Sequence, residues 1–269
     1  MDKRPIGVFD SGLGGLTCVK EIMKIMPNEE VIYFGDTGRV PYGTRSRDTI
    51  IKYVRQDIRF LKTFDIKAII IACGTASSAA LPWIEEENDT KVMGVVEPAA
   101  RAAVAATKNK RIGVLGTGAT IKYGKYMSNI KDICPDVEVF GKACPMFVPL
   151  VENGYTDSEA TRIIAREYLE EMKEKEIDTL ILGCTHYPLI KSVIGDIMGK
   201  DVTLIDSGAV AARAAYDFLD EKNLLNKGEK NGAYRYFVSD SVEDFSTLGS
   251  MFLDRPIKES VEKIDIEGF

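Results

Sequence analysis

Short apolar segments rich in β-branched residues alternate along the chain with longer segments of helical periodicity, and this alternation constrains the fold more than any other feature. Strands that are separated by helices pair in parallel, and the helices then cover both faces of the sheet. The sequence therefore predicts an α/β fold. The candidate strands are 6–9, 31–34, 68–72, 92–96, 111–115, 137–140, 179–182 and 202–205.

The segments between these strands carry helix signals. The run Thr156-Asp157-Ser158-Glu159 has the pattern of a capping box ahead of a helix that extends to about Lys175. An Ala-rich stretch from Gly208 to about Leu219 predicts another helix. A further helix is indicated by apolar residues that recur at helical spacing, namely Ile50, Ile51, Val54, Ile58 and Leu61.

The two halves of the chain resemble each other. Segment 6–12 is similar to 112–118, and segment 68–75 is similar to 179–185, at nearly equal offsets. This pattern predicts two similar α/β lobes, each with one cysteine just past a strand. The alternative is that apolar strands ending in small residues look alike in any α/β protein. We expect residues 1–97 with 207–269 to form one lobe and residues 98–206 the other, because Asp206-Ser207-Gly208 echoes Asp10-Ser11-Gly12.

Composition excludes several classes of function. The formal net charge is −6 and basic residues are not clustered, which argues against a nucleic-acid partner. No run approaches the roughly 20 apolar residues of a membrane span, and the first apolar segment is too short for a signal peptide. We therefore expect a cytoplasmic protein. The chain has one histidine and five cysteines without a CxxC pair, which predicts free thiols and no metal site.

Cys73 and Cys184 each follow a predicted strand, at the end of a parallel sheet where ligands usually bind. A helix that starts after each cysteine would lower the thiol pKa from about 8.5 and favour the thiolate. Two such thiols facing one cavity could accept and donate a proton. The alternative for each is a buried, inert cysteine, and we expect that state for the others, Cys18, Cys134 and Cys144.

Three further features bear on a site. His186 can act as a general acid or base and can tune Cys184, although a hydrogen-bonded core histidine is the alternative. The glycine-rich segment 10–15 allows close backbone approach to a ligand, but it is not a GxGxxG motif, and a capped turn is the alternative. The Pro41-Tyr42-Gly43 turn either holds a carboxylate through its N–H groups or is an ordinary surface turn.

Seven blocks of sequence, spread in order through most of the chain, match one family. They are Ile6-Gly7-Val8-Phe9-Asp10-Ser11-Gly12-Leu13-Gly14-Gly15, Tyr33-Phe34-Gly35-Asp36-Thr37, Pro41-Tyr42-Gly43, Cys73-Gly74-Thr75-Ala76-Ser77, Val96-Glu97-Pro98, Val148-Pro149-Leu150-Val151-Glu152 and Leu182-Gly183-Cys184-Thr185-His186-Tyr187-Pro188. With these blocks the chain resembles the glutamate racemases of the aspartate/glutamate racemase superfamily. The resemblance implies two lobes related by pseudo-symmetry around a central cleft, a homodimer, and interconversion of L- and D-glutamate for peptidoglycan synthesis. It implies no pyridoxal phosphate or other cofactor and no metal.

The resemblance also implies residue roles. Cys73 would take the α-proton from D-glutamate with help from Asp10, and Cys184 would take it from L-glutamate with help from His186. Glu152 and Asp36 would tune the site. The substrate's carboxylates and ammonium would be held by residues from the set Asp10, Ser11, Tyr42, Gly43, Gly74, Thr75, Thr117, Thr120, Thr185 and His186.

One position departs from the family pattern. The family usually has Cys-Asn-Thr where this chain has Cys73-Gly74-Thr75. Loss of one hydrogen bond to a charged group costs about 1.5–3 kcal/mol, so we expect weaker glutamate binding than in a typical member. Water or a neighbouring side chain would fill the gap left by the missing side chain.

Three alternatives stay open. The first is a racemase of a related amino acid such as aspartate. The second is a thiol redox protein, which the absence of CxxC disfavours. The third is a non-catalytic or weakened member with a binding or regulatory role.

Overall fold

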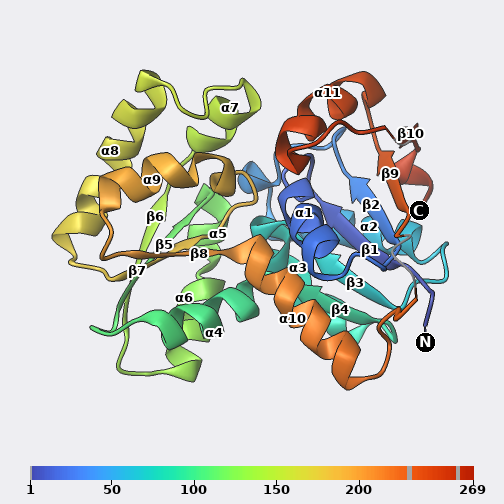
Figure 1. The fold of residues 1–269 in the computed structure, drawn as a ribbon, viewed down its shortest axis with the longest axis horizontal. Coiled ribbons are helices and arrows are strands. Elements are labelled where there is room, and N and C mark those ends of the chain that lie inside the picture. Colours follow the sequence, from blue (N-terminus) through green and yellow to red (C-terminus); the bar gives the residue numbers. More distant parts are fainter. Residues whose placement is uncertain (1, 229–231, 259–260) are drawn as a thin grey trace.

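The computed structural model describes residues 2–228, 232–258 and 261–269, and it confirms the α/β fold (Figure 1). The strands are β1 Ile6–Asp10, β2 Val31–Gly35, β3 Ala68–Ile71, β4 Lys91–Gly94, β5 Arg111–Gly116, β6 Glu138–Ala143, β7 Thr179–Leu182, β8 Thr203–Asp206, β9 Tyr234–Val238 and β10 Val261–Lys263. The α-helices are α1 Leu16–Ile25, α2 Arg47–Leu61, α3 Gly74–Glu86, α4 Val96–Ala106, α5 Gly118–Tyr123, α6 Lys125–Ile133, α7 Phe147–Glu152, α8 Glu159–Glu174, α9 Lys191–Met198, α10 Ser207–Glu221 and α11 Val242–Leu253, with 3₁₀ turns η1 Tyr42–Thr44, η2 Tyr187–Ile190 and η3 Ile266–Gly268.

Within the described ranges these strands form two parallel sheets. The first sheet has the order β10-β9-β2-β1-β3-β4, and the second has the order β6-β5-β7-β8. Every strand pair is parallel. Figure 1 shows the two sheets side by side, each with helices on both faces. Parallel strands are buried on both faces, which explains why β1, β3 and β7 are almost wholly apolar.

The predicted internal repeat is confirmed by topology. The order β2-β1-β3-β4 in the first sheet corresponds to β6-β5-β7-β8 in the second. Strand β3 thus occupies the same place as β7, and Cys73 and Cys184 each lie two residues past the end of their strand. The two cysteines are therefore placed alike in the two halves.

The eight predicted strands are present, with ends that differ by at most three residues. Strands β9 and β10 were not predicted, and they join the first sheet next to β2. Arg235 interrupts the apolar pattern of β9, and two of the three residues of β10 are charged.

The capping-box interpretation is wrong in detail. Helix α8 begins at Glu159, and its cap is Ser158, whose Oγ accepts a hydrogen bond from the N–H of Thr161 at 3.2 Å.

Apolar packing continues from one half to the other. One cluster of buried residues includes Ile6 and Val8 of β1 together with Leu180 and Leu182 of β7. Helix α10 packs against both α1 and α4, and Figure 1 shows it running beneath the junction of the halves. The predicted boundary at residues 97–98 falls in the first turn of α4.

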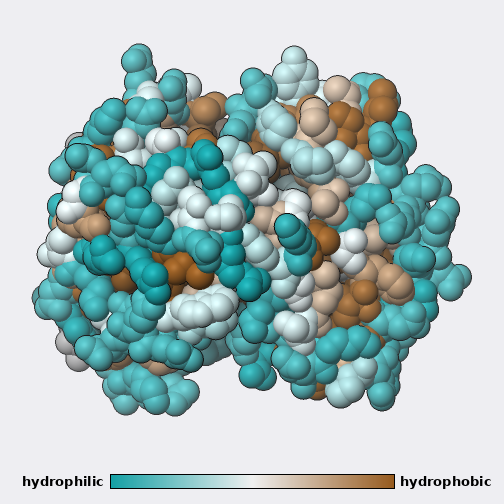
Figure 2. Space-filling model, turned by 180° about the vertical axis from the view of Figure 1, so that it is seen from behind, coloured by the Kyte–Doolittle hydropathy of each residue, from teal (hydrophilic) through white to brown (hydrophobic). Residues whose placement is uncertain are grey.

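The surface in Figure 2 is mostly hydrophilic, with hydrophobic residues in small separate groups. In the part of the chain that the structure describes, none of the helices combines the length and the apolar character that crossing a bilayer requires.

Candidate active site

A cavity of about 340 Å³ lies between the carboxyl ends of the two sheets. Both halves of the chain contribute to its wall, and both cysteines of interest, Cys73 and Cys184, line it. The other predicted site residues in the wall are Ser11, Tyr42, Gly43, Gly74, Thr75, Thr117, Glu152, Thr185 and His186. Asp10, Asp36 and Thr120 lie behind the wall and contact residues that form it.

Cys73 caps helix α3. Its Sγ accepts a hydrogen bond from the N–H of Ala76 at 3.4 Å, and its thiol lies 3.5 Å from Oγ of Ser11. We expected the helix N-terminus to lower the pKa of this thiol, and that expectation is wrong. Burial, reinforced by the carboxylate of Asp10, raises the pKa of Cys73 to about 12. Cys73 is therefore a protonated thiol at neutral pH in the free protein.

Cys184 has a different setting. The helix expected directly after it is instead the single 3₁₀ turn η2, and α9 starts only at Lys191. Its sulfur lies 3.9 Å from Nδ1 of His186. Nε2 of His186 lies 2.9 Å from Oε1 of Glu152, which ends α7.

The His186 side chain is a buried base with two acidic neighbours. Burial alone would lower its pKa, but hydrogen bonds to Cys184 and Glu152 raise the pKa of His186 to about 10. The ring also packs edge-on against Phe252 of α11, with ring centroids 5.1 Å apart. An imidazolium held in this way places a positive charge beside the sulfur of Cys184.

Asp10 ends β1 and links the two halves. Its Oδ2 accepts a hydrogen bond from the N–H of Gly12 at 3.0 Å, and its Oδ1 lies 3.4 Å from the hydroxyl of Thr185. Burial raises the pKa of Asp10 above its ordinary value. The carboxyl group therefore reaches the cavity through Thr185.

Three threonine hydroxyls meet at one side of the cavity. Thr75 Oγ1 lies 2.9 Å from Thr117 Oγ1 and 3.2 Å from Thr120 Oγ1, and the latter two lie 3.0 Å apart. Thr75 belongs to α3, whereas Thr117 caps α5. The cluster joins the two halves and offers hydroxyl groups that can donate to a carboxylate.

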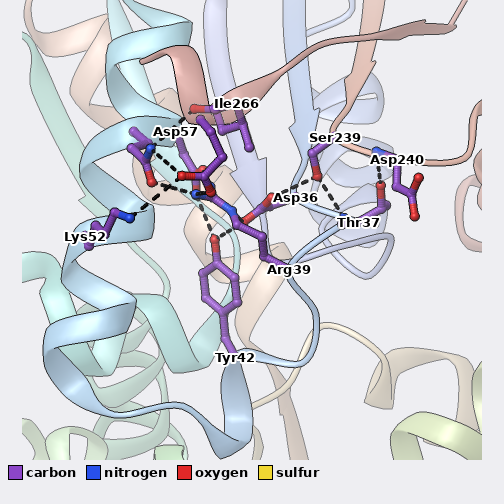
Figure 3. Close-up of polar contacts among 12 residues, drawn as sticks. Asp36, Thr37, Arg39, Tyr42, Lys52, Asp57, Ser239, Asp240 and Ile266 are labelled. Carbon is purple, nitrogen blue, oxygen red and sulfur yellow. Dashed lines mark hydrogen bonds and ion pairs between the residues drawn. The ribbon is translucent and has the colours of Figure 1, made fainter.

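The Pro41-Tyr42-Gly43 segment is not an ordinary surface turn, because Tyr42 is buried in η1. The Tyr42 hydroxyl donates to the carboxylate of Asp36 and lies 3.1 Å from Oδ2 of Asp57 (Figure 3). Arg39 joins the same two carboxylates, through Nε at 2.7 Å from Asp36 and Nη2 at 2.8 Å from Asp57. Since the Tyr42 hydroxyl is committed to this network, the turn offers its ring and the backbone of Gly43 to the cavity.

Gly74 lies against the backbone of the other half. A Cβ atom built there would lie well inside 3.0 Å of the carbonyl oxygen of Gly183, so that oxygen fills the place where a side chain would begin. Gly74 also lines the cavity.

Sequence reasoning missed part of the wall. An apolar side of the cavity is formed by Val40, Pro41, Cys144, Pro145, Val148 and Pro149. Cys144 was expected to be a buried, inert cysteine, and the structure shows that it lines the cavity and directly follows the carboxyl end of β6. The predicted strand stopped at residue 140, four residues before Cys144, so the rule that singled out Cys73 and Cys184 did not reach it. Burial raises the pKa of this thiol as well.

Comparison with known proteins identifies the family to which the chain belongs. Residues 16–215 match the family model described as Asp/Glu/Hydantoin racemase. A glutamate racemase from Geobacter metallireducens is 48% identical over 253 residues, covering 94% of each chain. Among solved structures, glutamate racemase isoform RacE1 from Bacillus anthracis superposes with a TM-score of 0.95 at 37% identity, over 98% of each chain. Glutamate racemase from Francisella tularensis in complex with D-glutamate superposes with a TM-score of 0.93 at 40% identity, over the whole of both chains. The chain belongs to the Asp/Glu/Hydantoin racemase family.

Proposed function

We propose that this protein interconverts L- and D-glutamate, using Cys73 and Cys184 as its two proton-transfer groups and no organic cofactor or metal. The observation that carries the proposal is that one thiol from each half of the chain lines a single cavity. Inversion of a stereocentre requires proton removal from one face and proton delivery to the other, and groups from two similar halves suit that task.

The unlike surroundings of the two thiols support a division of labour. With L-glutamate, a thiolate at Cys184, stabilised by the His186 imidazolium, accepts the α-proton. The thiol of Cys73, which its raised pKa keeps protonated, donates a proton to the opposite face. The product is D-glutamate, with a thiol at Cys184 and a thiolate at Cys73. The reverse reaction starts from that state, with Asp10 assisting Cys73.

The wall offers donors for the substrate. An amino acid's α-proton is weakly acidic, so neutral and charged donors must hold the carboxylates and stabilise the developing negative charge. Asp10, Glu152 and His186 supply charge beside the reacting centre. The remaining binding groups are the hydroxyls of Ser11, Thr75, Thr117 and Thr185, supported by Thr120 and Asp36 from behind, and the backbone at Tyr42, Gly43 and Gly74. The complex of the Francisella tularensis relative with D-glutamate supports this substrate class.

We further propose that the D-glutamate serves peptidoglycan synthesis, and that the protein works in the cytoplasm as a homodimer. The glutamate racemase names of the relatives support the proposed role in peptidoglycan synthesis. We also propose that residues 1–97 with 207–269 form one lobe and residues 98–206 the other. The free state of the five cysteines agrees with a reducing compartment.

Circular dichroism of L- and D-glutamate, incubated with purified protein and no added cofactor, tests the proposal. We expect the ellipticity of either enantiomer to decay to zero. Faster decay of aspartate would instead favour a racemase for the shorter substrate. No decay with either amino acid, together with a Cys73–Cys184 disulfide formed under mild oxidation, would favour a thiol redox protein.

A further inference from the structure

The turns that carry the two reactive thiols touch each other through their backbones. The position that a Cβ atom of residue 74 would take lies 3.3 Å from the carbonyl carbon of Gly183, closer still to its oxygen, and 3.7 Å from the hydroxyl of Tyr126. Gly74 follows Cys73 directly, and Gly183 precedes Cys184. The contact therefore joins the immediate neighbours of both sulfur-bearing residues.

Gly183 packs closely against the second sheet. Its N–H donates to the carbonyl oxygen of Leu115 at 2.8 Å. A Cβ atom on Gly183 would lie 2.5 Å from that same oxygen and 3.2 Å from the ring of Tyr126. Gly183 is thus held close to Leu115 of β5, and a side chain added to this chain at residue 74 would have to displace either the Gly183 carbonyl or the Cys73 turn.

A second glycine of the first half holds the other end of the Cys184 turn. A Cβ atom on Gly14 would overlap the Thr185 hydroxyl and lie 2.6 Å from Nδ1 of His186. Next to it, the Thr17 hydroxyl donates to the carbonyl oxygen of Thr185 at 3.0 Å. The turn that carries Cys184 is therefore seated between Gly74 on one side and Gly14 on the other.

We propose that Gly74 is a positioning residue for proton transfer, because it admits the Gly183 carbonyl and so fixes the separation of the Cys73 and Cys184 sulfurs across the cavity. The proposal rests on the two-thiol reaction proposed above. Both sulfurs must reach one α-carbon at the same time, and a displacement of about 1 Å in such a geometry can cost about 100-fold in rate. In this chain a backbone contact sets that geometry where family members usually carry an Asn side chain.

The reaction provides a readout that depends on the distance between the thiols. When both thiols are in reach, one thiolate takes the α-proton, and the carbanion receives a proton from the opposite thiol with inversion. If the opposite thiol is displaced, the first thiol exchanges its proton for a solvent deuteron and returns it to the same face. The substrate then gains deuterium but keeps its configuration. The rate of this exchange with retention, divided by the rate of inversion, therefore reports on the separation of the two sulfurs.

The variant Gly74→Ala, in D₂O with L- and D-glutamate, tests the proposal. We expect inversion to fall about 100-fold while the ratio of retained exchange to inversion rises at least tenfold. The matched control is Gly195→Ala in α9, where a Cβ atom would make only an ordinary contact of 3.6 Å with Leu204. This control should keep both the rate and the ratio of the parent protein.

Gly74→Asn is the second variant, because the family usually carries Asn at this position and a folded protein is therefore expected. If Gly74→Ala does not fold, a raised ratio in Gly74→Asn supports the proposal and an unchanged ratio overturns it. If Gly74→Ala folds, as judged by thermal unfolding, and its ratio is unchanged, the proposal is overturned even if its rate falls. A parent protein that neither inverts nor exchanges glutamate would instead overturn the proposed function.

Discussion

The carboxylate of the partly exposed Glu152 pairs with the buried imidazole of His186, with Oε1 2.9 Å from Nε2, and this pairing turns the other ring nitrogen toward Cys184. Glu152 comes from the end of α7 and His186 from the turn after β7, so tertiary packing of the second half creates the contact. A carboxylate on one imidazole nitrogen fixes the ring orientation and favours the protonated ring.

Replacement of Glu152 by Gln should weaken catalysis and shift its pH dependence. Glutamine keeps the size of the side chain but removes the charge that helps to raise the pKa of His186. A hydrogen bond to a charged partner is worth about 1–1.4 kcal/mol more than a neutral one, so we expect roughly a fivefold to tenfold lower rate with L-glutamate. The alkaline limb of the rate–pH profile should move to lower pH. Glu170→Gln, an exposed change on α8, should alter neither quantity.

The protein should lose stability as the pH rises from about 6.5 toward 10. The pKa of His186 is about 10 in the folded protein against an ordinary value of 6.5, so the folded state keeps a proton that the unfolded chain releases. The resulting stabilisation is complete below pH 6.5 and is lost as the pH approaches 10, with a slope of at most about 1.4 kcal/mol per pH unit. Urea unfolding between pH 6.5 and 9.5 measures this slope. The decline should be shallower in His186→Asn, and parallel curves for the two proteins would contradict the prediction.

Single cysteine variants should separate the two half-reactions. Cys184→Ala should lose racemisation about 1,000-fold, yet it should still exchange the α-proton of D-glutamate with D₂O through Cys73. Cys73→Ala should show the opposite preference and exchange only L-glutamate. Proton NMR of the α-position follows both exchanges. Cys134→Ala changes a half-buried cysteine outside the cavity wall and serves as the control. Exchange of both enantiomers by either active-site variant would be inconsistent with two opposed thiols.

The fold could be predicted from the sequence to the extent that its signals are local. Strands such as β3 and β7 are buried on both faces, so they read as continuous apolar runs. Strand β9 lacks such a run because Arg235 lies within it, and its place beside β2 depends on a contact with a distant part of the chain. The internal repeat could be predicted because each half carries it as a local sequence pattern, an apolar strand followed by a turn of small residues.

The candidate site was only partly predictable for the same reason. The ends of β3 and β7 indicated Cys73 and Cys184 as site residues. Whether the pKa of Cys73 is raised or lowered depends on burial, which no local sequence pattern reveals. The contact of Gly74 with Gly183 and the pairing of Arg39 with Asp57 depend on tertiary packing. Cys144 was missed because β6 extends three residues beyond the predicted strand end at residue 140.

Arg39 should be one of the most sensitive positions for stability. Its guanidinium bridges the buried carboxylates of Asp36 and Asp57 and lies 2.6 Å from Oε1 of Gln56, while the carboxyl-terminal Glu267 contacts it from outside (Figure 3). Burial and the neighbouring Asp36 charge raise the pKa of Asp57, and the Arg39 charge opposes that rise. Removal of one partner from a buried ion pair leaves uncompensated charge and costs about 3–5 kcal/mol.

We therefore expect Arg39→Met to lower the free energy of unfolding by about 3–5 kcal/mol in urea at pH 7. The matched control is Arg213→Met, because Arg213 forms an exposed ion pair with Asp217, at 3.0 Å, that is worth less than about 1 kcal/mol. The loss in Arg39→Met should shrink as the pH falls and the Asp57 carboxyl, whose pKa is raised, takes up a proton, since a neutral carboxyl no longer needs the guanidinium. A loss that matches the control, or one that does not change with pH, would show that the stability of the protein does not depend on the buried charges of Arg39, Asp36 and Asp57.

The same variant should also affect substrate binding, because Tyr42 donates to the Asp36 carboxylate and lines the cavity. Arg39→Met should therefore raise KM for glutamate more than it lowers kcat.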